Sequence, residues 1–413
     1  MSMQIIGDLH IHSKYSRGCS TNLDINNLEK YARVKGVDLL GTGDFTHPKW
    51  IEELKKLREE DGILKTESGF PFVCQTELSL IYSQDGKGRR VHNVVLAPNL
   101  EVVDQITDEL KKRGRVDYDG RPIFKIPCPE FVEMLNQISP DIEVIPAHIW
   151  TPWFSMFGEN SGFNTVKDCF QDKTNKIHAL ETGMSSDPAM NWRLSQLDKF
   201  NLVSFSDLHS FWPWRIGREA TEIDLKKLTY KNILNAIRDS GITRTIEVDP
   251  NYGKYHLTGH RKCNVCLEPK ESVKLNDVCP VCKKKLTVGV LERVEELADR
   301  EEGYVDKNRP GFITLIPLSE IIAHLYGFGV ATKKVWDVYN QLIDAFKSEF
   351  NIMLNVSKEE LAKVVDERLA DAIINNREGK IKVKAGYDGV YGEPVFKDKI
   401  KELSKKQASL SDF

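Results

Sequence analysis

The sequence of 413 residues contains no long apolar run and carries almost no net charge. No stretch approaches the roughly 20 apolar residues of a membrane-spanning helix, and the first residues do not follow the pattern of a secretory signal peptide. We therefore expect no membrane partner and a cytoplasmic location. Because the formal net charge is −3, a surface that binds nucleic acid has to be a local patch. Internal repeats and low-complexity segments are absent as well.

Cysteine is sparse outside one short segment. In a reducing compartment, thiols bind metals or stay buried more often than they form disulfides. Four of the eight cysteines are scattered and are predicted to be inert core residues: Cys19, Cys74, Cys128 and Cys169. The other four form the pairs CNVC and CPVC and are Cys263, Cys266, Cys279 and Cys282. This spacing predicts a tetrahedral structural zinc site, and the second pair argues against the alternative of a redox dithiol.

The helical and strand-like patterns divide the chain into four segments. Residues 1–250 alternate short apolar strands with helices, which predicts an α/β domain with a largely parallel sheet or barrel. Within it, one helix is expected over residues 188–200. Residues 251–290 contain the paired cysteines without helical periodicity and are predicted to form a small zinc-binding module. Helical periodicity in residues 291–400 predicts a helical domain, and residues 401–413 form a charged tail.

Histidine and acidic residues recur at the ends of the predicted strands. In DLHIH, the alternation of a strand places the side chains of Asp8, His10 and His12 on one face. Asp207 and His209 repeat this spacing after another apolar run. Further candidates at or near strand ends are Asp44, His47, Glu77, His92 and His148. Active sites of α/β barrels and open sheets are assembled at the carboxyl ends of strands, so we expect these side chains to lie together.

Imidazole and carboxylate groups are ligands that suit zinc, manganese or iron. The number of such groups exceeds what one ion can bind, so two or three ions are expected. A bridging carboxylate, Glu77 or Asp207, would hold two ions about 3.5–4 Å apart, and such a pair activates water and stabilises a phosphoryl group. This predicts phosphoester hydrolysis with Glu77, Asp207 and His209 as catalytic residues. Any one histidine could instead be an ordinary hydrogen-bonded residue, and His178 and Glu181 are interpreted as strand residues.

The motifs DLHIHS, GTGDFTH and SDLHS resemble those of the PHP (polymerase and histidinol phosphatase) superfamily. The resemblance implies a distorted (β/α)7 barrel with a trinuclear metal centre. It implies one site from His10, His12, Glu77 and Asp207, a second from Glu77, His92 and His148, and a third served by His209. Two departures from the superfamily pattern concern this third site. Arg17 stands where an acidic residue or histidine is usual, and the usual Asp-His pair reads Asp44-Phe45, with the histidine displaced to His47.

Two loops after the histidine-bearing strands are rich in aromatic residues, WTPWFSMFGENSGF and FWPWRIGR. Trp153, Trp212 and Trp214 are candidates to stack on nucleic-acid bases, and Arg215 and Arg218 are candidates to contact phosphates. The alternative is a packed roof over the metals. The tail offers a separate motif, Q-x-x-L-x-x-F, formed by Gln407, Leu410 and Phe413. It resembles the peptide that docks on the sliding clamp PCNA as one helical turn in a groove.

A PHP-like barrel, a four-cysteine module and a helical domain with IPLSEIIA and KAGYDGVYGEP resemble, in this order, the endonuclease Q family. HSKYSRGCS and GTGDFTHP strengthen the resemblance. It implies a DNA repair nuclease of archaeal type that cleaves the phosphodiester 5′ to deaminated bases (uracil, hypoxanthine, xanthine) and abasic sites. With structural zinc in the cysteine module, we expect two or three barrel ions (zinc, possibly magnesium or manganese). A flipped lesion base needs a pocket, and we expect this pocket between the barrel loops and the added domains. Alternatives are a small-molecule phosphatase of the histidinol-phosphate type and a non-catalytic DNA-binding repair adaptor.

Overall fold

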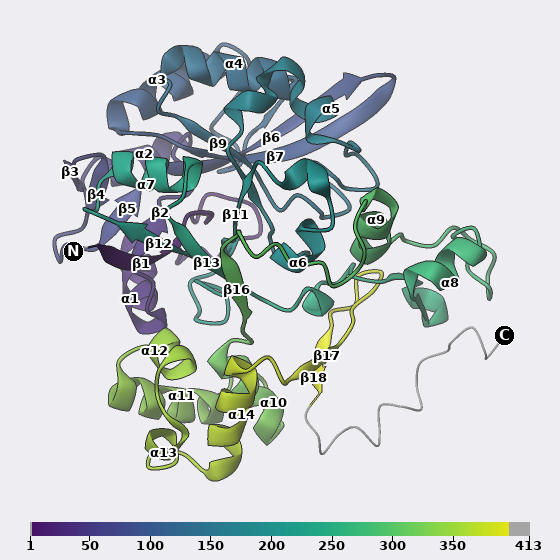
Figure 1. The fold of residues 1–413 in the computed structure, drawn as a ribbon. Coiled ribbons are helices and arrows are strands. Elements are labelled where there is room, and N and C mark those ends of the chain that lie inside the picture. Colours follow the sequence, from purple (N-terminus) through teal and green to yellow (C-terminus); the bar gives the residue numbers. More distant parts are fainter. Residues whose placement is uncertain (1, 396–413) are drawn as a thin grey trace.

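The computed structural model describes residues 2–395 (Figure 1). The strands are β1 (Met3–Asp8), β2 (Leu39–Gly41), β3 (Arg58–Glu60), β4 (Ile63–Lys65), β5 (Pro71–Val73), β6 (Gln75–Gln84), β7 (Lys87–Leu96), β8 (Ile123–Phe124), β9 (Glu143–Pro146), β10 (Ala179–Glu181), β11 (Asn201–Val203), β12 (Ala220–Leu225), β13 (Ile242–Glu247), β14 (Thr258–His260), β15 (Val265–Leu267), β16 (Gly311–Thr314), β17 (Lys382–Lys384) and β18 (Glu393–Val395). The helices are α1 (Ile25–Lys35), α2 (Pro48–Leu54), α3 (Leu100–Lys111), α4 (Cys128–Ile138), α5 (Val166–Phe170), α6 (Pro188–Asn191), α7 (Tyr230–Arg238), α8 (Pro269–Lys274), α9 (Val290–Leu297), α10 (Leu318–Tyr326), α11 (Lys333–Phe346), α12 (Glu349–Leu354), α13 (Lys358–Leu361) and α14 (Glu367–Arg377), with short 3₁₀ turns η1 (Gln171–Lys176), η2 (Ser195–Leu197), η3 (Pro250–Tyr252) and η4 (Arg261–Cys263). The predicted tail motif of Gln407, Leu410 and Phe413 lies outside the described residues.

The strands form mixed sheets, where the sequence predicted largely parallel ones. The largest sheet has the order β16-β13-β12-β1-β2-β5-β4-β3. In it, β1 runs parallel to β2 but antiparallel to β12. A second sheet has the order β8-β6-β7-β9, in which β6 and β7 form a long antiparallel hairpin. Its turn uses Asp85 and Gly86 with φ angles of 54° and 73°, the left-handed conformation that a tight hairpin reversal favours.

The sheets join into a distorted barrel, as predicted. The parallel pair β10 and β11 lies between β9 and β13. Backbone hydrogen bonds connect neighbouring strand ends around the ring: Ala97 N to Cys74 O (3.0 Å), Ala147 N to His92 O (3.0 Å), Ile149 N to Glu181 O (3.1 Å) and Thr182 N to Val203 O (2.9 Å). Strands that are far apart in the sequence therefore end beside one another.

One hydrophobic cluster joins strands from around the barrel. Its fully buried members include Leu39, Val73, Val94, Ile145, Val203 and Ile223. Helix α7 adds Ile233, Leu234 and Ile237, which recur at helical spacing on its buried face. Burial of apolar area contributes about 25 cal/mol per Å². This cluster therefore fixes the strands whose ends carry the polar residues.

The C-terminal part is helical, as predicted, and it also returns to the barrel. Helices α10 to α14 gather at the bottom of Figure 1. Before them, β16 adds to the barrel sheet as the parallel neighbour of β13. After them, β17 and β18 form a hairpin whose connecting turn bonds to the segment around Asn251 (Gly386 N to Asn251 O, 2.9 Å). The boundaries of the four predicted segments remain predictions.

The helix expected over residues 188–200 is broken into the short elements α6 and η2. The carbonyl of Arg193 accepts hydrogen bonds from the backbone N–H groups of Asp299 and Arg300, both at 3.1 Å. A carbonyl used in this way cannot continue the helical ladder. The tertiary contact therefore overrides the local pattern.

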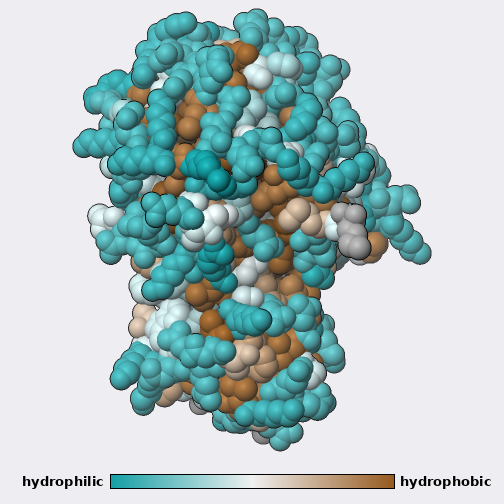
Figure 2. All heavy atoms as spheres, turned by 90° about the vertical axis from the view of Figure 1, so that its left-hand side faces the viewer, coloured by the Kyte–Doolittle hydropathy of each residue, from teal (hydrophilic) through white to brown (hydrophobic). Residues whose placement is uncertain are grey.

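Among residues 2–395, no helix is long and apolar enough to cross a membrane. Figure 2 views the side that lies to the left in Figure 1. That face is mostly hydrophilic, and its hydrophobic atoms gather toward the middle and the lower part.

Candidate metal centre

Four predicted residues form a first group of metal-binding atoms. Donor atoms of His10, His12, Glu77 and Asp207 all lie within 4.8 Å of one another. His12 Nε2 lies 3.0 Å from Asp207 Oδ1 and 3.2 Å from Glu77 Oε2. His10 Nε2 approaches the same two carboxylates at 3.6 and 3.7 Å. The segments after β1 and β11 and the strand β6 thus meet at one point.

A second group shares Glu77 with the first. Its other members are His92 and His148. His92 Nδ1 lies 2.6 Å and His148 Nε2 lies 3.1 Å from Glu77 Oε1. The two oxygens of this buried carboxylate therefore face different sets of imidazoles. Of the two bridging candidates, Glu77 belongs to both groups, whereas Asp207 belongs to one.

Hydrogen-bond partners at Nδ1 orient three of the imidazole rings. Nδ1 of His10 donates to Glu181 Oε1 (2.9 Å), and Nδ1 of His12 donates to Asp44 Oδ1 (3.0 Å). Nδ1 of His148 lies 3.1 Å from the hydroxyl of Thr151. An occupied Nδ1 fixes the tautomer and leaves Nε2 as the ligand, which is the usual support of a metal-binding histidine.

Three residues of the centre have positive φ angles, which residues other than glycine rarely adopt. The φ angles of Asp44, His148 and Asp207 are 43°, 31° and 46°. Such conformations carry a cost and persist where the surrounding structure enforces them, often at functional sites. Asp8 helps to fix the segment around Asp207, because its carboxylate accepts from the N–H groups of Ser206 and Gly217, both at 2.9 Å. Asp8 itself belongs to neither donor group.

The electrostatics of the centre favour bound cations. Burial disfavours a protonated His10, but the charge of Glu181, with smaller contributions from two other carboxylates, raises the pKa of this ring well above its usual value. Burial would raise the pKa of Glu77, yet the charges of His92 and Arg121 lower it well below the usual range. His10 Nε2 is buried without a hydrogen-bond partner. Divalent ions bound here would take the place of the protons that these carboxylates attract.

The predicted ligand Asp44 supports the centre from outside the donor groups. Its Oδ1 accepts from His12, and its Oδ2 accepts from the backbone N–H of Ser13 (2.6 Å) and the hydroxyl of Ser16 (3.0 Å). Both oxygens are thus engaged by the protein. The structure gives Asp44 the position of a residue that orients His12.

His47 and His209 also lie outside the two donor groups. The ring of His47 stacks on Tyr15, with centroids 4.4 Å apart. His209 donates from Nδ1 to the carbonyl of Asp207 (2.9 Å) and is partly exposed at the mouth of the centre. A third ion bound by these residues stays a prediction.

The sequence did not identify two residues that form hydrogen bonds with the donor groups. Glu181 was interpreted as a strand residue, but it bonds His10 Nδ1 and accepts from the backbone N–H of His148 (2.7 Å). Arg121 donates to Glu77 Oε2 (3.0 Å) from the loop before β8. A signal existed for Glu181, since it ends an apolar strand as the other candidates do. Arg121 lies in an irregular loop without periodicity and had none.

A cavity of about 560 Å³ opens above the centre. His92, His148, Asp207 and His209 line it, as do the predicted DNA-contacting residues Trp153, Arg215 and Arg218. Part of the Arg218 guanidinium is already hydrogen-bonded within the protein, because its Nε and Nη2 donate to the carbonyl of Ser206. Trp214 lines an adjoining cavity of about 370 Å³. Trp212 stacks on Trp214 (centroids 5.4 Å apart) and packs against Trp336 of α11.

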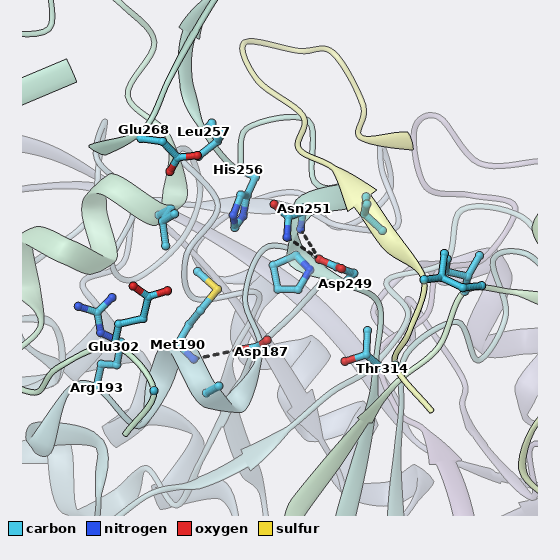
Figure 3. Close-up of a pocket in the computed structure, with 18 of the residues that line it drawn as sticks. Asp187, Met190, Arg193, Asp249, Asn251, His256, Leu257, Glu268, Glu302 and Thr314 are labelled. Carbon is cyan, nitrogen blue, oxygen red and sulfur yellow. Dashed lines mark hydrogen bonds between the residues drawn. The ribbon is translucent and has the colours of Figure 1, made fainter. Parts of the chain in front are cut away.

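A further cavity of about 630 Å³ (Figure 3) is larger, and none of these histidines lines it. Carboxylates dominate its polar lining: Asp187, Asp249, Glu268 and Glu302. Burial raises the pKa of Asp187 to about 6. A phosphate backbone would be repelled there, and none of the metal-binding groups found among residues 2–395 belongs to this cavity.

The cysteine module contains a third group of donor atoms, formed by His260, Cys263, Cys279 and Cys282. His260 Nδ1 lies 3.2 Å from Cys282 Sγ. Cys266, the remaining predicted ligand, is outside this group. In β15 the neighbouring residues Val265 and Leu267 are buried in the module, so alternation turns Cys266 to the other face. Three predicted cysteines thus converge with a histidine that the sequence analysis missed, although its spacing of three residues from Cys263 was visible.

Comparisons with known proteins extend along the whole chain. The family model of the MJ0043 C-terminal domain matches residues 317–380. The uncharacterized protein YqxK of Bacillus subtilis is 30% identical over 414 residues, which cover 94% of this chain and 99% of that protein. The uncharacterized protein MJ0043 of Methanocaldococcus jannaschii is 33% identical over 266 residues, which cover 63% of this chain and 33% of that protein. The chain therefore spans about a third of the length of MJ0043.

Two solved structures match all of this chain, each with a TM-score of 0.86 and 33% sequence identity. One is the lesion-specific endonuclease PfuEndoQ from Pyrococcus furiosus, of which 98% is covered. The other is a complex of endonuclease Q with a 27-mer duplex substrate that has an abasic lesion at the active site, and all of that chain is covered. This likeness over the full length shows that the chain belongs to the endonuclease Q family.

Proposed function

We propose that this protein is a metal-dependent DNA repair endonuclease. Its reaction would be hydrolysis of the phosphodiester on the 5′ side of deaminated bases (uracil, hypoxanthine and xanthine) and of abasic sites. The observation that carries the proposal is the position of Glu77, whose two oxygens face two sets of imidazoles. The endonuclease Q complex with an abasic duplex supports DNA as the substrate.

The chain supplies the binding and positioning groups of this reaction. His10, His12, Glu77 and Asp207 would hold one ion, and Glu77, His92 and His148 a second. Bound zinc, magnesium or manganese would make water acidic enough to react near neutral pH and would offset phosphate charge. His209 Nδ1 is bonded to the carbonyl of Asp207, so Nε2 would be the nitrogen that exchanges a proton with the substrate.

The lesion needs a pocket, because a base within the duplex stack cannot be inspected on its pairing edge. The cavity over the centre and the adjoining cavity share Met184, Arg215, Arg218 and Tyr391. Both are lined by barrel loops and by residues of the C-terminal part. We place the flipped nucleotide in this paired space, with its 5′ phosphate toward Glu77.

The test is nicking of a duplex with a single abasic site or deoxyinosine, in the presence of manganese or magnesium. Wild-type protein should nick the strand 5′ to the lesion, and His10→Ala should lose this activity. His178→Ala is the matched control, because His178 also bonds a buried glutamate, Glu143 (3.0 Å), but lies outside the centre. Hydrolysis of a phosphomonoester without any nicking would favour the phosphatase alternative. Binding of the duplex without hydrolysis would favour the adaptor.

Two further assignments complete the proposal. The group of His260, Cys263, Cys279 and Cys282 has the thiolate and imidazole donors of a closed tetrahedral zinc site, and we assign structural zinc to it. Gln407, Leu410 and Phe413 form the proposed PCNA-binding peptide, supported by the sequence motif. The full chain should co-elute with PCNA in gel filtration, and a chain that ends at residue 406 should elute separately. Co-elution of the shortened chain would contradict this assignment.

A further inference from the structure

Three aromatic side chains from distant segments stand at the mouth of the metal centre. Trp153 follows β9, Tyr255 follows η3, and Tyr391 lies in the segment between β17 and β18. All three line the cavity over the centre. We call Trp153, Tyr255 and Tyr391 the aromatic rim. Tyr391 also lines the adjoining cavity, so it stands at the divide between the two spaces.

The rim presents ring surface to solvent and holds a cation among its rings. Trp153 is 37% exposed and Tyr391 is 56% exposed. Trp153 and Tyr255 meet edge to face, with centroids 5.1 Å apart. Lys254 Nζ lies 5.5 Å from the ring centroid of Tyr255 and 5.8 Å from that of Tyr391. Exposed aromatics interleaved with a basic side chain are the usual means of holding unpaired nucleotides.

The backbone holds Tyr391 in place. Gly389 N donates to the carbonyl of Lys254 (2.8 Å), and Gly392 N donates to the carbonyl of Tyr252 (3.1 Å). The approach is so close at residue 392 that a Cβ there would lie 2.1 Å from the carbonyl oxygen of Asn251, which requires glycine. These bonds attach the turn before β18 to the segment after η3. A backbone that is fixed before binding loses little entropy when the residue meets a ligand.

We propose that the aromatic rim binds the bases beside the flipped nucleotide. Tyr391 fills the gap that the flipped nucleotide leaves in the duplex, Trp153 stacks on a neighbouring base, and Lys254 contacts a phosphate. The inference rests on the proposed function, which supplies the flipped nucleotide, and adds a role for residues outside the metal centre. Four residues line both cavities, and Tyr391 is the aromatic one among them, which selects it as the filling residue.

The experiment measures binding of full-length, metal-loaded protein to a fluorescent duplex with one abasic site and a phosphorothioate that slows cleavage. Tyr391→Ala should weaken binding about tenfold, which is the loss expected for one stacking contact. Tyr391→Phe keeps the ring and should bind as wild type does. Tyr304→Ala removes another exposed tyrosine, one that does not line this cavity, and is the matched control. Lys254→Gln should reduce the slope of log K against log salt by about 0.9.

Each outcome supports or overturns the role of Tyr391. Wild-type affinity in Tyr391→Ala, or an equal loss in Tyr391→Phe, would overturn it, because neither result follows from stacking of a ring. The proposed function is tested separately by nicking of the unmodified duplex. If wild type binds but does not nick while Tyr391→Ala loses affinity, the rim stands and the nuclease assignment falls. If wild type nicks and Tyr391→Ala binds normally, the nuclease assignment stands and the role of Tyr391 falls.

Discussion

A buried ion pair connects the barrel to the helical part, and its removal should loosen their contact. Lys35, the last residue of α1, donates from Nζ to Glu349 Oε1 (2.7 Å) and to the carbonyl of Pro213 (2.9 Å). The side chains of Lys35 and Glu349 are only 2% and 1% exposed. Glu349, at the start of α12, also accepts from the N–H of Leu318 (2.9 Å) and the hydroxyl of Tyr339 (2.8 Å).

The magnitude follows from leaving Glu349 charged and buried without its cation. Lys35→Met keeps most of the side-chain volume but removes the charge, and breaking such a pair by removing one partner costs about 3–5 kcal/mol. Tyr339→Phe removes one hydrogen bond to the charged carboxylate and should cost about 1.5–3 kcal/mol. In the double variant Lys35→Met/Glu349→Gln no unpaired charge remains. Its loss of unfolding free energy should therefore be smaller than the sum of the losses in Lys35→Met alone and Glu349→Gln alone.

Urea unfolding followed by tryptophan fluorescence is the appropriate assay. Trp336 of α11 packs against Trp212 and Trp214 of the barrel loop, with centroids 5.7 and 5.6 Å apart, so emission reports on this contact. The free energy of the transition should fall by several kcal/mol in Lys35→Met. A loss below about 1 kcal/mol, the range of an exposed pair, would refute the reasoning. A double variant whose loss equals the sum of the single losses would refute it as well.

Three other predictions concern the zinc module, the support of the metal centre and a buried acid. His260→Ala should lose one zinc ion per chain by mass spectrometry while Cys266→Ser keeps it, and the reverse pattern would return Cys266 to the ligand set. Glu181→Gln should lower the affinity of the barrel for metal about 10- to 100-fold in equilibrium dialysis; Glu143→Gln is the control, and equal losses in both variants would deny Glu181 a specific role. Burial raises the pKa of Glu247 to about 8, so the folded state keeps a proton that the unfolded chain releases near pH 4.5, and this contribution to stability declines as pH rises between those values. The thermal stability of Glu247→Gln relative to wild type should therefore increase as the pH is raised from 5 to 9. A difference in stability that does not change with pH would contradict this prediction.

The sequence was most informative where a local rule fixes the direction of a side chain. The alternation in DLHIH identified His10 and His12, and the repeat after β11 identified Asp207. Their convergence with Glu77 was expected because strand ends meet at one edge of a barrel. The α/β fold class and the helical C-terminal region could also be predicted, because both depend on local periodicity and on the order of the elements along the chain.

The sequence was least informative where partners come from distant or irregular segments. Arg121 reaches Glu77 from a loop without a pattern, and Glu181 differs from an ordinary strand residue only through its contact with His10. The spacing in CNVC indicated two zinc ligands, but alternation in β15 turns Cys266 away from the group. The contacts of Arg121 and Glu181 depend on packing against other elements, which local patterns do not encode.

The most direct test of the account is anomalous diffraction from a crystal of this protein grown with manganese and a duplex that contains an abasic site. We predict manganese peaks on both sides of the Glu77 carboxylate, within the two donor groups, and the phosphate 5′ to the lesion beside them. Peaks confined to the cysteine module, or a lesion phosphate bound away from Glu77, would contradict the central claim.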